Sequence, residues 1–384
     1  MNHLLVKPHS YHTLDAWRAI ASLWVVIFHM SLVLLVSYPQ LSVNPLYIFS
    51  LSGSLGVQMF FVISGYCIAN AACKAHVRNH GFNTFMKARV RRIFPPYLYA
   101  LVLSGALSLL ALWLVSSHHL RSSVMADHNL LHQSGLYFFS NLTLTQGIFR
   151  QQFLLAQAWT LCYEMAFYLI VGLLLLVAYL SKGKFSLLPM LNFVTCTLLL
   201  LLIAFPQYVK YPLDLWPQFG LGIMAYDVLS HPGHLKPKLW IAAATLLVLC
   251  FAVVDQGYIG LMGEKVRPSF LFCLAFTGLI VLLHKYDEML NKTLPVKLLS
   301  TLGLLSYSLY LTHTFSIGLI NQAVKALHLS VNYHFPVFIL FIVLSVGFAR
   351  LFFQYCEKPF IGTTKKQASL PPLVPEGVSA KQAP

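Results

Sequence analysis

Long apolar runs recur along the whole sequence, and they decide what kind of fold this chain can adopt. About 20 apolar residues in a helix cross the roughly 30 Å hydrocarbon layer of a membrane, and about ten runs reach that length. The predicted spans are residues 17–36, 54–72, 96–117, 157–180, 187–205, 215–230, 239–254, 268–284, 301–321 and 335–354. Because 58% of the 384 residues are hydrophobic and only 10% are charged, the composition agrees. The sequence therefore predicts an all-α, polytopic membrane protein with about ten transmembrane helices.

Lys and Arg are distributed unevenly around these runs. The net charge of +15 would by itself be compatible with a nucleic-acid partner. If both termini lie in the cytoplasm, most basic residues fall on the inner side, and those outside are Arg121, Arg150, Lys210, Lys265, Arg267 and Lys325. This split follows the positive-inside bias of membrane proteins. The charge thus predicts topology, with both termini cytoplasmic, and no nucleic-acid partner.

Two further features bound the organisation of the chain. Residues 362–384 are polar and Pro-rich, so we expect a disordered cytoplasmic tail after one transmembrane domain over residues 1–361. The seven cysteines show no CxxC pair and no metal-ligand spacing, and most lie inside predicted spans. We interpret them as small packing residues and expect neither a disulfide framework nor a metal site.

The first predicted span carries a polar stripe, in the stretch LDAWRAIASLWVVIFH of residues 14–29. At about 100° per residue, Arg18 and His29 lie three turns apart and nearly aligned, with Asp15 and Ser22 close to the same line. An ionisable side chain inside such a helix is costly, so it is expected to face the protein interior and to serve a function. The alternative is a buried packing histidine, which the aligned polar residues disfavour.

A basic loop precedes the third predicted span. In FMKARVRRIFPPYLY, Arg89 and Arg92 are spaced i, i+3 and share a face if the segment is helical, and we expect Pro95 and Pro96 to end that helix. A pair of guanidinium groups suits phosphate. Ordinary positive-inside anchoring is the alternative.

The second predicted span, which contains SGSLGVQMFFVISGY, is rich in small residues. Gly56, Phe60 and Ser64 share a face at i, i+4, i+8. Small residues permit close helix packing. Ser64 therefore either packs against a neighbouring helix or lines a cavity.

The fourth predicted span opens with QAWTLCYEMAFYL. Thr160, Glu164 and Tyr168 stack at i, i+4, i+8, with Trp159 beside them. A carboxylate inside the membrane needs a cationic or hydrogen-bonding partner. Glu164 is therefore either part of a site or the neutralising partner of a structural arginine.

The last two predicted spans hold the remaining polar candidates. In LSYSLYLTHTF, Ser306, Tyr310 and His313 share one face at i, i+4, i+7. With His29, His313 raises the alternative of a haem held by two histidines, although neither span is otherwise shaped around a porphyrin. In YCEKPF, Glu357 is expected to lie in the membrane interface, where Pro359 ends the helix.

Taken together, these segments resemble the acyltransferase 3 family of integral-membrane O-acyltransferases. The matching segments are LDAWRAIASLWVVIFH with ten residues between Arg18 and His29, GVQMFFVISGY, the RxxR of Arg89 and Arg92, WTLCYEMAFY, YSLYLTH and EKPF. They follow the family's order from about residue 13 to 361. The resemblance implies about ten transmembrane helices. It also implies transfer of an acyl group, commonly acetyl, from cytoplasmic acyl-CoA to a hydroxyl of a glycan or another acceptor.

The resemblance also implies roles for individual residues. His29 would be catalytic and Arg18 would support it, while the i, i+3 spacing of Asp15 and Arg18 predicts that Asp15 holds Arg18 in place. The donor-binding candidates are Arg89, Arg92 and Ser64. The remaining pocket candidates are Trp159, Glu164, Tyr310, His313 and Glu357. No bound cofactor is expected, because acyl-CoA is a co-substrate.

The mechanism and the acceptor stay open at the level of sequence. His29, with an ordinary imidazole pKa of about 6.5, can take the proton of a sugar hydroxyl or can itself carry the acyl group. We expect the acceptor to be a surface or secreted polysaccharide or its lipid-linked precursor, and the location to be a bacterial inner membrane. The alternatives are a transporter or flippase of a lipid-linked sugar, and a non-catalytic partner in polysaccharide export. Transporters often show repeated halves, which this sequence lacks.

Overall fold

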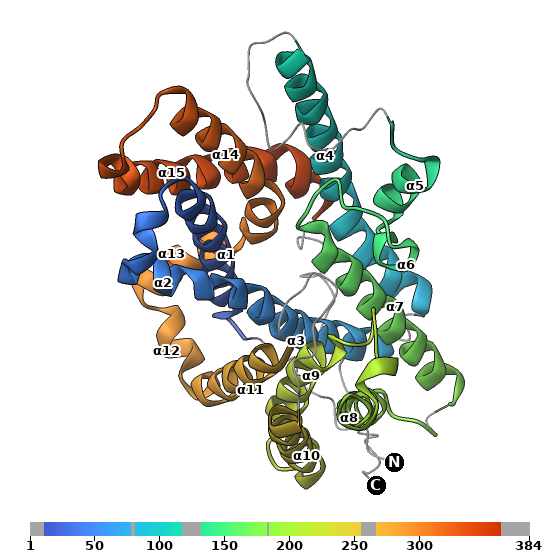
Figure 1. Cartoon of the computed structure of the whole chain (residues 1–384). Helices are drawn as coiled ribbons and strands as arrows, with labels where there is room; N and C mark the ends of the chain where they lie inside the picture. The colour runs from blue at the N-terminus through green and yellow to red at the C-terminus, as the bar shows by residue number, and fades with distance from the viewer. Residues whose placement is uncertain (1–10, 78–80, 117–131, 183, 255–265, 362–384) are drawn as a thin grey trace, which may run out of the picture.

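The structure is a computed structural model that describes residues 11–77, 81–116, 132–182, 184–254 and 266–361 (Figure 1). No β-strand occurs within these ranges. The long helices are α1 (Leu14–Ser37), α3 (Leu55–Val77), α4 (Phe82–Ser116), α7 (Ala158–Leu180), α8 (Leu187–Ala204), α9 (Trp216–Ser230), α10 (Leu235–Val254), α11 (Val266–Leu283), α14 (Ser306–Ala326) and α15 (His334–Phe352). The shorter α-helices are α2 (Pro45–Ser50), α5 (Gly135–Thr143), α6 (Gln146–Phe149), α12 (Asp287–Asn291) and α13 (Leu294–Gly303). The chain is an all-α, polytopic membrane protein.

The helices that could cross a membrane agree closely with the predicted number of about ten. Among the described residues, eight helical segments are long and apolar enough to cross a membrane, or up to nine if a bent pair forms one span. The prediction for residues 215–230 was wrong in this respect, because α9 has 15 residues. Such a helix is about 22 Å long, which is less than the roughly 30 Å hydrocarbon thickness. Helix α9 is instead buried along most of its length.

Helix α4 does not begin where the sequence suggested. We expected Pro95 and Pro96 to end a short helix and a new span to start at residue 96, but one helix of 35 residues runs from Phe82 to Ser116 through both prolines. Each proline lacks an N–H, so the carbonyls of Arg91 and Arg92 lose their partners four residues ahead. The hydroxyl of Tyr307 in α14 donates to the neighbouring carbonyl of Ile93 at 2.9 Å and ties α14 to this point.

The ninth predicted span is broken near its start. Helices α13 and α14 meet at an angle of 70°, with the break between Gly303 and Ser306. A Cβ added at Gly303 would lie 1.8 Å from the backbone oxygen of Asp15, so the end of α13 packs directly against the start of α1. The break therefore places the first turn of α14 close to the polar end of α1.

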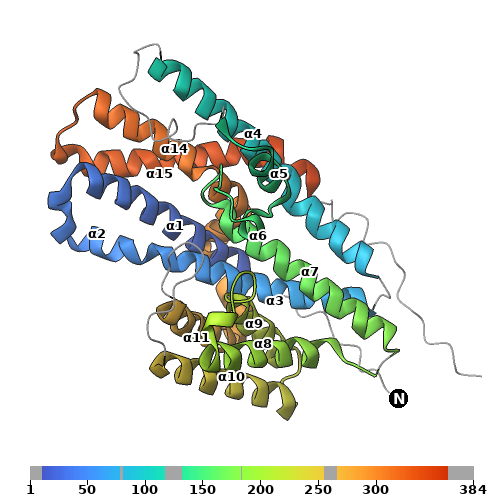
Figure 2. The ribbon, with the colours of Figure 1, turned by 45° about the vertical axis from the view of Figure 1, so that its right-hand side comes forward.

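Helix α3 lies at the centre of the bundle (Figures 1 and 2). It contacts α1, α4, α7, α9 and α11, while α8, α9, α10 and α11 pack against one another on one side. Helix α3 packs closely against α9 because each helix has a glycine at the contact. A Cβ at Gly65 would lie 1.9 Å from the backbone oxygen of Phe219, and one at Gly222 would lie 2.0 Å from that of Val62.

Some predictions fall outside the described residues. These are the tail over residues 362–384 and the outer-side placement of Arg121 and Lys265. The orientation of the bundle, with both termini cytoplasmic, stays a prediction.

Candidate functional site

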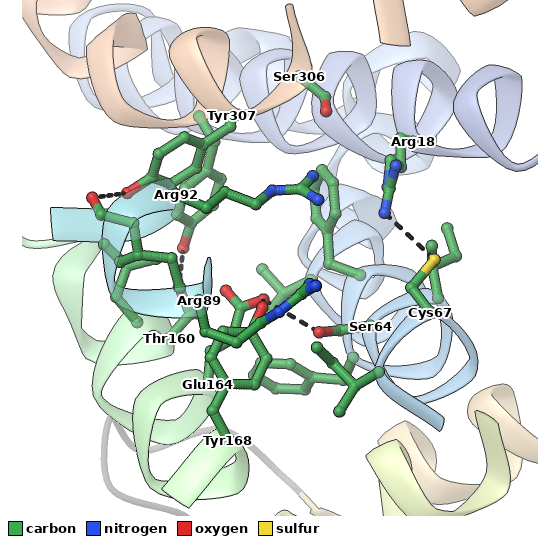
Figure 3. A pocket seen from close by; sticks show the side chains of 18 residues that line it. Arg18, Ser64, Cys67, Arg89, Arg92, Thr160, Glu164, Tyr168, Ser306 and Tyr307 are labelled. Carbon is green, nitrogen blue, oxygen red and sulfur yellow. Dashed lines mark hydrogen bonds between the residues drawn. The ribbon is translucent and has the colours of Figure 1, made fainter. Parts of the chain in front are cut away.

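A cavity of about 100 Å³ lies among α1, α3, α4, α7 and α14. Its wall combines apolar side chains with an unusual number of polar ones (Figure 3). The polar lining residues are Arg18, Ser64, Cys67, Arg89, Arg92, Thr160, Glu164, Tyr168, Ser306, Tyr307 and Tyr310. The cavity thus brings together polar faces that the sequence placed on four separate predicted spans and one loop.

Three guanidinium groups reach this cavity. Arg89 and Arg92 lie one turn apart on α4, and Arg18 comes from α1 (Figure 3). Because α4 is already helical before the prolines, both of its arginines present the same face. Arg89 is partly buried, and its Nε is a buried donor without a hydrogen-bond partner in the described chain. Donors of this kind are available for an anionic ligand.

Arg18 is held in place by its own helix and by α3. Its Nη1 donates to Oδ1 of Asp15 at 2.8 Å, the i, i+3 pair expected from the sequence, and its Nη2 donates to Sγ of Cys67 at 3.3 Å. We had interpreted Cys67 as a packing residue, but it lines the cavity. The signal that could have found it is its place one turn after Ser64, on the same face of α3.

Glu164 is oriented by hydroxyl groups. Ser64 Oγ donates to Oε1 of Glu164 at 3.0 Å, and the hydroxyl of Tyr168 donates to the same oxygen. Because these two groups are its hydrogen-bond partners within the described chain, hydroxyls rather than an arginine fix the carboxylate. Thr160, one turn before Glu164, also lines the cavity. The face of α7 predicted from the sequence therefore points into the cavity.

The first turns of α14 close the cavity on another side. Ser306, Tyr307 and Tyr310 line it, so the amino-terminal end of α14, with its unpaired N–H groups and positive dipole end, borders the cavity. The hydroxyl of Tyr310 is 2.8 Å from Oγ1 of Thr160 and donates to the carbonyl of Gln157 at 3.1 Å. Tyr310 thereby joins α14 to the start of α7.

His29 and His313 do not line the cavity. They lie beyond Tyr310, since the ring centroid of Tyr310 is 6.0 Å from that of His313, which is 4.9 Å from that of His29. The polar stripe of α1 therefore serves two places, with Arg18 in the cavity and His29 beside His313. A porphyrin cannot fit between two imidazole rings at this distance, so the structure disfavours the haem alternative.

Two other candidates lie outside the cavity wall. Trp159 packs edge-on against Phe61, with ring centroids 6.3 Å apart. Glu357 was expected in the interface, but it is buried and accepts a hydrogen bond from Ser308 Oγ at 2.5 Å. The reason is that α15 continues into a π-helical turn, Phe353–Glu357, which contacts α4 and brings the carboxylate to the first turn of α14.

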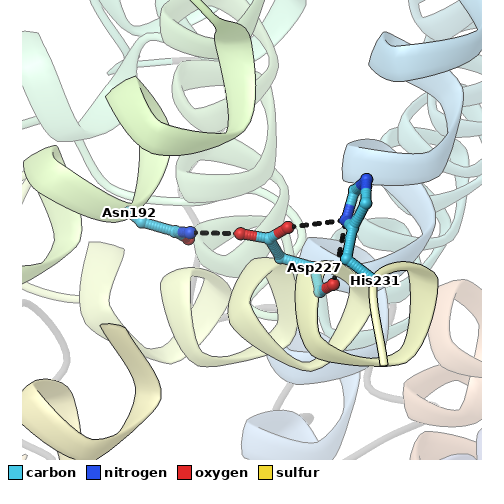
Figure 4. A network of polar contacts seen from close by, with 3 residues as sticks. All are labelled: Asn192, Asp227 and His231. Atoms are coloured by element: carbon cyan, nitrogen blue, oxygen red, sulfur yellow. Dashed lines mark hydrogen bonds and ion pairs between the residues drawn. The ribbon is translucent and has the colours of Figure 1, made fainter. Parts of the chain in front are cut away.

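A second polar network lies between α8 and α9, which the sequence did not reveal (Figure 4). Asn192 donates to Oδ2 of buried Asp227 at 2.7 Å, and Nδ1 of His231 donates to Oδ1 at 3.0 Å. The spacing of Asp227 and His231, i, i+4 at the end of a helix, is the signal that could have indicated it. The network satisfies a buried carboxylate and joins two helices away from the cavity.

Fold and site together define a class of protein. A helical bundle holds a cavity lined by three guanidinium groups and an oriented carboxylate, and a pair of imidazoles lies next to it. This arrangement suits a membrane enzyme that binds a polyanionic ligand and moves a proton or a group.

Comparison with known proteins gives the family. A family model described as an acyltransferase domain matches residues 11–353, which is most of the chain. The chain therefore belongs to the acyltransferase 3 family. No solved structure is significantly similar to it.

Three relatives have names that describe O-acetyl transfer. A putative peptidoglycan O-acetyltransferase, YrhL, of Bacillus subtilis is 24% identical over 90% of this chain and 54% of the relative. The O-acetyltransferase OatA of Staphylococcus aureus is 24% identical over 92% of this chain and 58% of the relative. An O-acetyl transferase of Shigella phage Sf6 is 28% identical over 50% of this chain and 53% of the relative. This chain thus spans a little over half the length of these relatives.

Proposed function

We propose that this protein is a membrane O-acyltransferase that moves an acetyl or other short acyl group from acyl-CoA to a hydroxyl of a glycan. The observation that carries the proposal is the cavity with Arg18, Arg89 and Arg92, which lies next to the pair His29 and His313 in a chain of the acyltransferase 3 family. A polyanion-binding cavity and an imidazole base are the two parts that such a transfer needs.

The arginines suit the donor. Acyl-CoA carries several phosphate groups, and guanidinium groups bind phosphate through paired, charge-assisted hydrogen bonds. Arg92 is exposed and Arg89 is half-buried, and both line the cavity. Arg92 therefore lies nearer the surface and Arg89 deeper. Arg18 lies on α1, across the cavity from them (Figure 3). We expect phosphates at Arg89 and Arg92 and the thioester arm deeper inside.

His29 is suited to the transfer step. Its Nδ1 lies 2.9 Å from the carbonyl oxygen of Val25. Because a carbonyl only accepts, Nδ1 carries the hydrogen and Nε2 keeps its lone pair. That lone pair can take the proton of an acceptor hydroxyl, or it can attack the thioester and carry the acyl group itself. Both routes start from the same tautomer.

The acceptor is inferred by analogy. The names of the relatives in Bacillus subtilis, Staphylococcus aureus and phage Sf6 all describe O-acetyl transfer, and one of them specifies peptidoglycan. We infer a bacterial polysaccharide or its lipid-linked precursor as the acceptor class and the inner membrane as the location. The positive-inside orientation would place the arginine side of the cavity toward the cytoplasm, where acyl-CoA is made.

The test is acetyl transfer by the purified protein in nanodiscs, with radiolabelled acetyl-CoA and a glycan acceptor. The double substitution Arg89→Ala, Arg92→Ala is expected to raise the KM for acetyl-CoA at least about tenfold, because it removes two charge-assisted contacts of roughly 1.5–3 kcal/mol each. The matched control is Lys87→Ala, Arg91→Ala. It removes two basic residues that are exposed on the same helix and do not line the cavity.

Two outcomes would count against the proposal. Equal KM values for the two double variants would remove the donor assignment of Arg89 and Arg92. A folded wild-type protein that neither binds nor turns over acetyl-CoA would contradict the proposed function and favour transport of a lipid-linked sugar.

A further inference from the structure

His313 is a buried imidazole that the proposed transfer does not yet use. Its side chain is 0% exposed, and its ring centroid lies 4.9 Å from that of His29, with the two ring planes at 56°. The rings come from different helices, α1 and α14, which pack against each other. His29 is partly exposed, so it is the outer member of the pair and His313 is the inner one.

The backbone fixes the tautomers of both rings in the same way. Nδ1 of His313 lies 2.8 Å from the carbonyl oxygen of Tyr310, as Nδ1 of His29 lies 2.9 Å from that of Val25. Both Nδ1 atoms must donate, because a carbonyl only accepts. Each ring therefore has a lone pair on Nε2.

Nε2 of His313 is left without a partner. It is buried and has no hydrogen bond within the described chain. A buried acceptor without a donor is unfavourable, and such an atom in a native structure calls for an explanation. A nearby N–H that appears only during the reaction would supply the missing donor.

We propose that His313 is a positioning residue for His29, and that its Nε2 accepts a hydrogen bond from His29 when His29 becomes protonated during transfer. The inference rests on the proposed function. The O–H bond of the acceptor breaks, and its proton goes to Nε2 of His29. The acceptor oxygen bonds to the acyl carbon as the C–S bond of the thioester breaks. Nε2 of His313 shares the proton until the departing thiolate takes it and leaves as a thiol.

The surroundings of His313 keep its ring in place for this role. Tyr310, whose carbonyl binds Nδ1 of His313, is itself bonded to Thr160 of α7. Gln157 donates to the carbonyl of Leu311 at 2.6 Å and to Oγ1 of Thr314 at 3.2 Å. The segment of α14 that carries His313 is thus fixed to the start of α7. A pre-oriented acceptor stabilises the protonated state of His29 and not the neutral resting state, which is the differential effect that catalysis requires.

The experiment measures acetyl transfer by the full chain in nanodiscs for wild type, His313→Phe and His313→Gln. Phe keeps a ring but has no nitrogen, whereas Gln retains a side-chain acceptor. We expect kcat to fall about 10–100-fold in His313→Phe, the usual effect of losing a supporting partner, and to recover in part in His313→Gln. The KM for acetyl-CoA stays within twofold, since His313 does not line the donor cavity.

The split between kcat and KM separates this role from a structural one. A lost hydrogen-bond acceptor lowers kcat alone and is partly restored by Gln, whereas a packing defect lowers kcat equally in both variants and raises the KM. The control is His334→Gln. Nδ1 of His334 also lies 2.7 Å from a carbonyl of its own segment, that of Val331, but its ring neighbour is Tyr47 rather than a histidine. This control is expected to behave as wild type.

The outcomes are distinct. Wild-type kcat in folded His313→Phe overturns the inference alone. Equal losses in His313→Phe and His313→Gln together with a raised KM mean a structural role and also overturn it. Absence of transfer by wild type overturns the proposed function and, with it, this inference.

Discussion

Glu164 shares the cavity wall with three arginines, yet its hydrogen bonds come from the hydroxyls of Ser64 and Tyr168. Both hydroxyls donate to Oε1, so they stabilise one oxygen of a carboxylate in a region of low dielectric. Within the described chain no hydrogen bond or ion pair joins Glu164 to Arg89 or Arg92, so these guanidinium groups stay available to a ligand. At the scale of the residue, this division fits the proposed donor site better than a closed ion-pair network would.

The hydrogen bond from Ser64 to Glu164 gives a test of that arrangement. Ser64→Ala is expected to lower the free energy of unfolding by about 1–3 kcal/mol, because it leaves a partly buried carboxylate with one donor fewer. Denaturant unfolding in detergent measures the change. Ser52→Ala is the control, since the hydroxyl of Ser52 makes a solvent-exposed hydrogen bond to the carbonyl of Phe49, and the effect is expected within about 0.5 kcal/mol. An equal effect of the two substitutions would contradict the role of Ser64.

Periodicity predicted the faces of these residues but not the depth at which a cavity begins and ends. The face of Thr160, Glu164 and Tyr168 follows from the i, i+4 rule. The i, i+4 rule could not predict that Arg18 lines the cavity while His29 lies outside it, because both residues belong to the same stripe of α1. Tyr310, on another helix, lies between the cavity and the histidine pair. The structure places these residues, and their roles in catalysis stay predictions.

At the scale of the element, hydropathy located the helices well because each span must bury its own backbone hydrogen bonds. The predicted and observed helices differ at two places, at the prolines of α4 and at the break between α13 and α14. Helix α4 continues through Pro95 and Pro96, because its neighbours supply contacts that propensity does not include. The break before Ser306 follows a single glycine, Gly303, which by itself does not predict a bend of 70°. It follows from the packing of Gly303 against the start of α1.

The contact between α3 and α9 depends on close approach of two backbones. A Cβ at Gly65 would meet the backbone oxygen of Phe219 at 1.9 Å, which no rotamer change can relieve. Gly65→Ala is therefore expected to destabilise the protein by at least about 3 kcal/mol. Gly278→Ala is the matched control, since nothing lies within 4 Å of its Cβ, and it is expected to be neutral or slightly stabilising. Thermal unfolding in detergent compares them, and similar melting curves would contradict the packing described here.

At the scale of the whole molecule, the membrane orientation decides where donor and acceptor enter. The positive-inside bias predicts that Lys74, near the end of α3, faces the cytoplasm and that Tyr208, after α8, faces outward. Both side chains are exposed. A cysteine introduced at Tyr208 is expected to react with a membrane-impermeant maleimide in intact bacterial cells. A cysteine introduced at Lys74 is expected to react only after permeabilisation. Labelling of the parent protein gives the baseline. The reverse pattern would contradict the orientation.

The central claim is that His29 performs acyl transfer, and one measurement tests it most directly. Purified wild type and His29→Ala are compared for transfer of radiolabelled acetyl from acetyl-CoA to a glycan, together with binding of acetyl-CoA to each. We predict that His29→Ala binds acetyl-CoA within twofold of wild type, since His29 lies outside the arginine-lined cavity, and loses transfer by at least about a hundredfold. Transfer by folded His29→Ala at the wild-type rate would contradict the account.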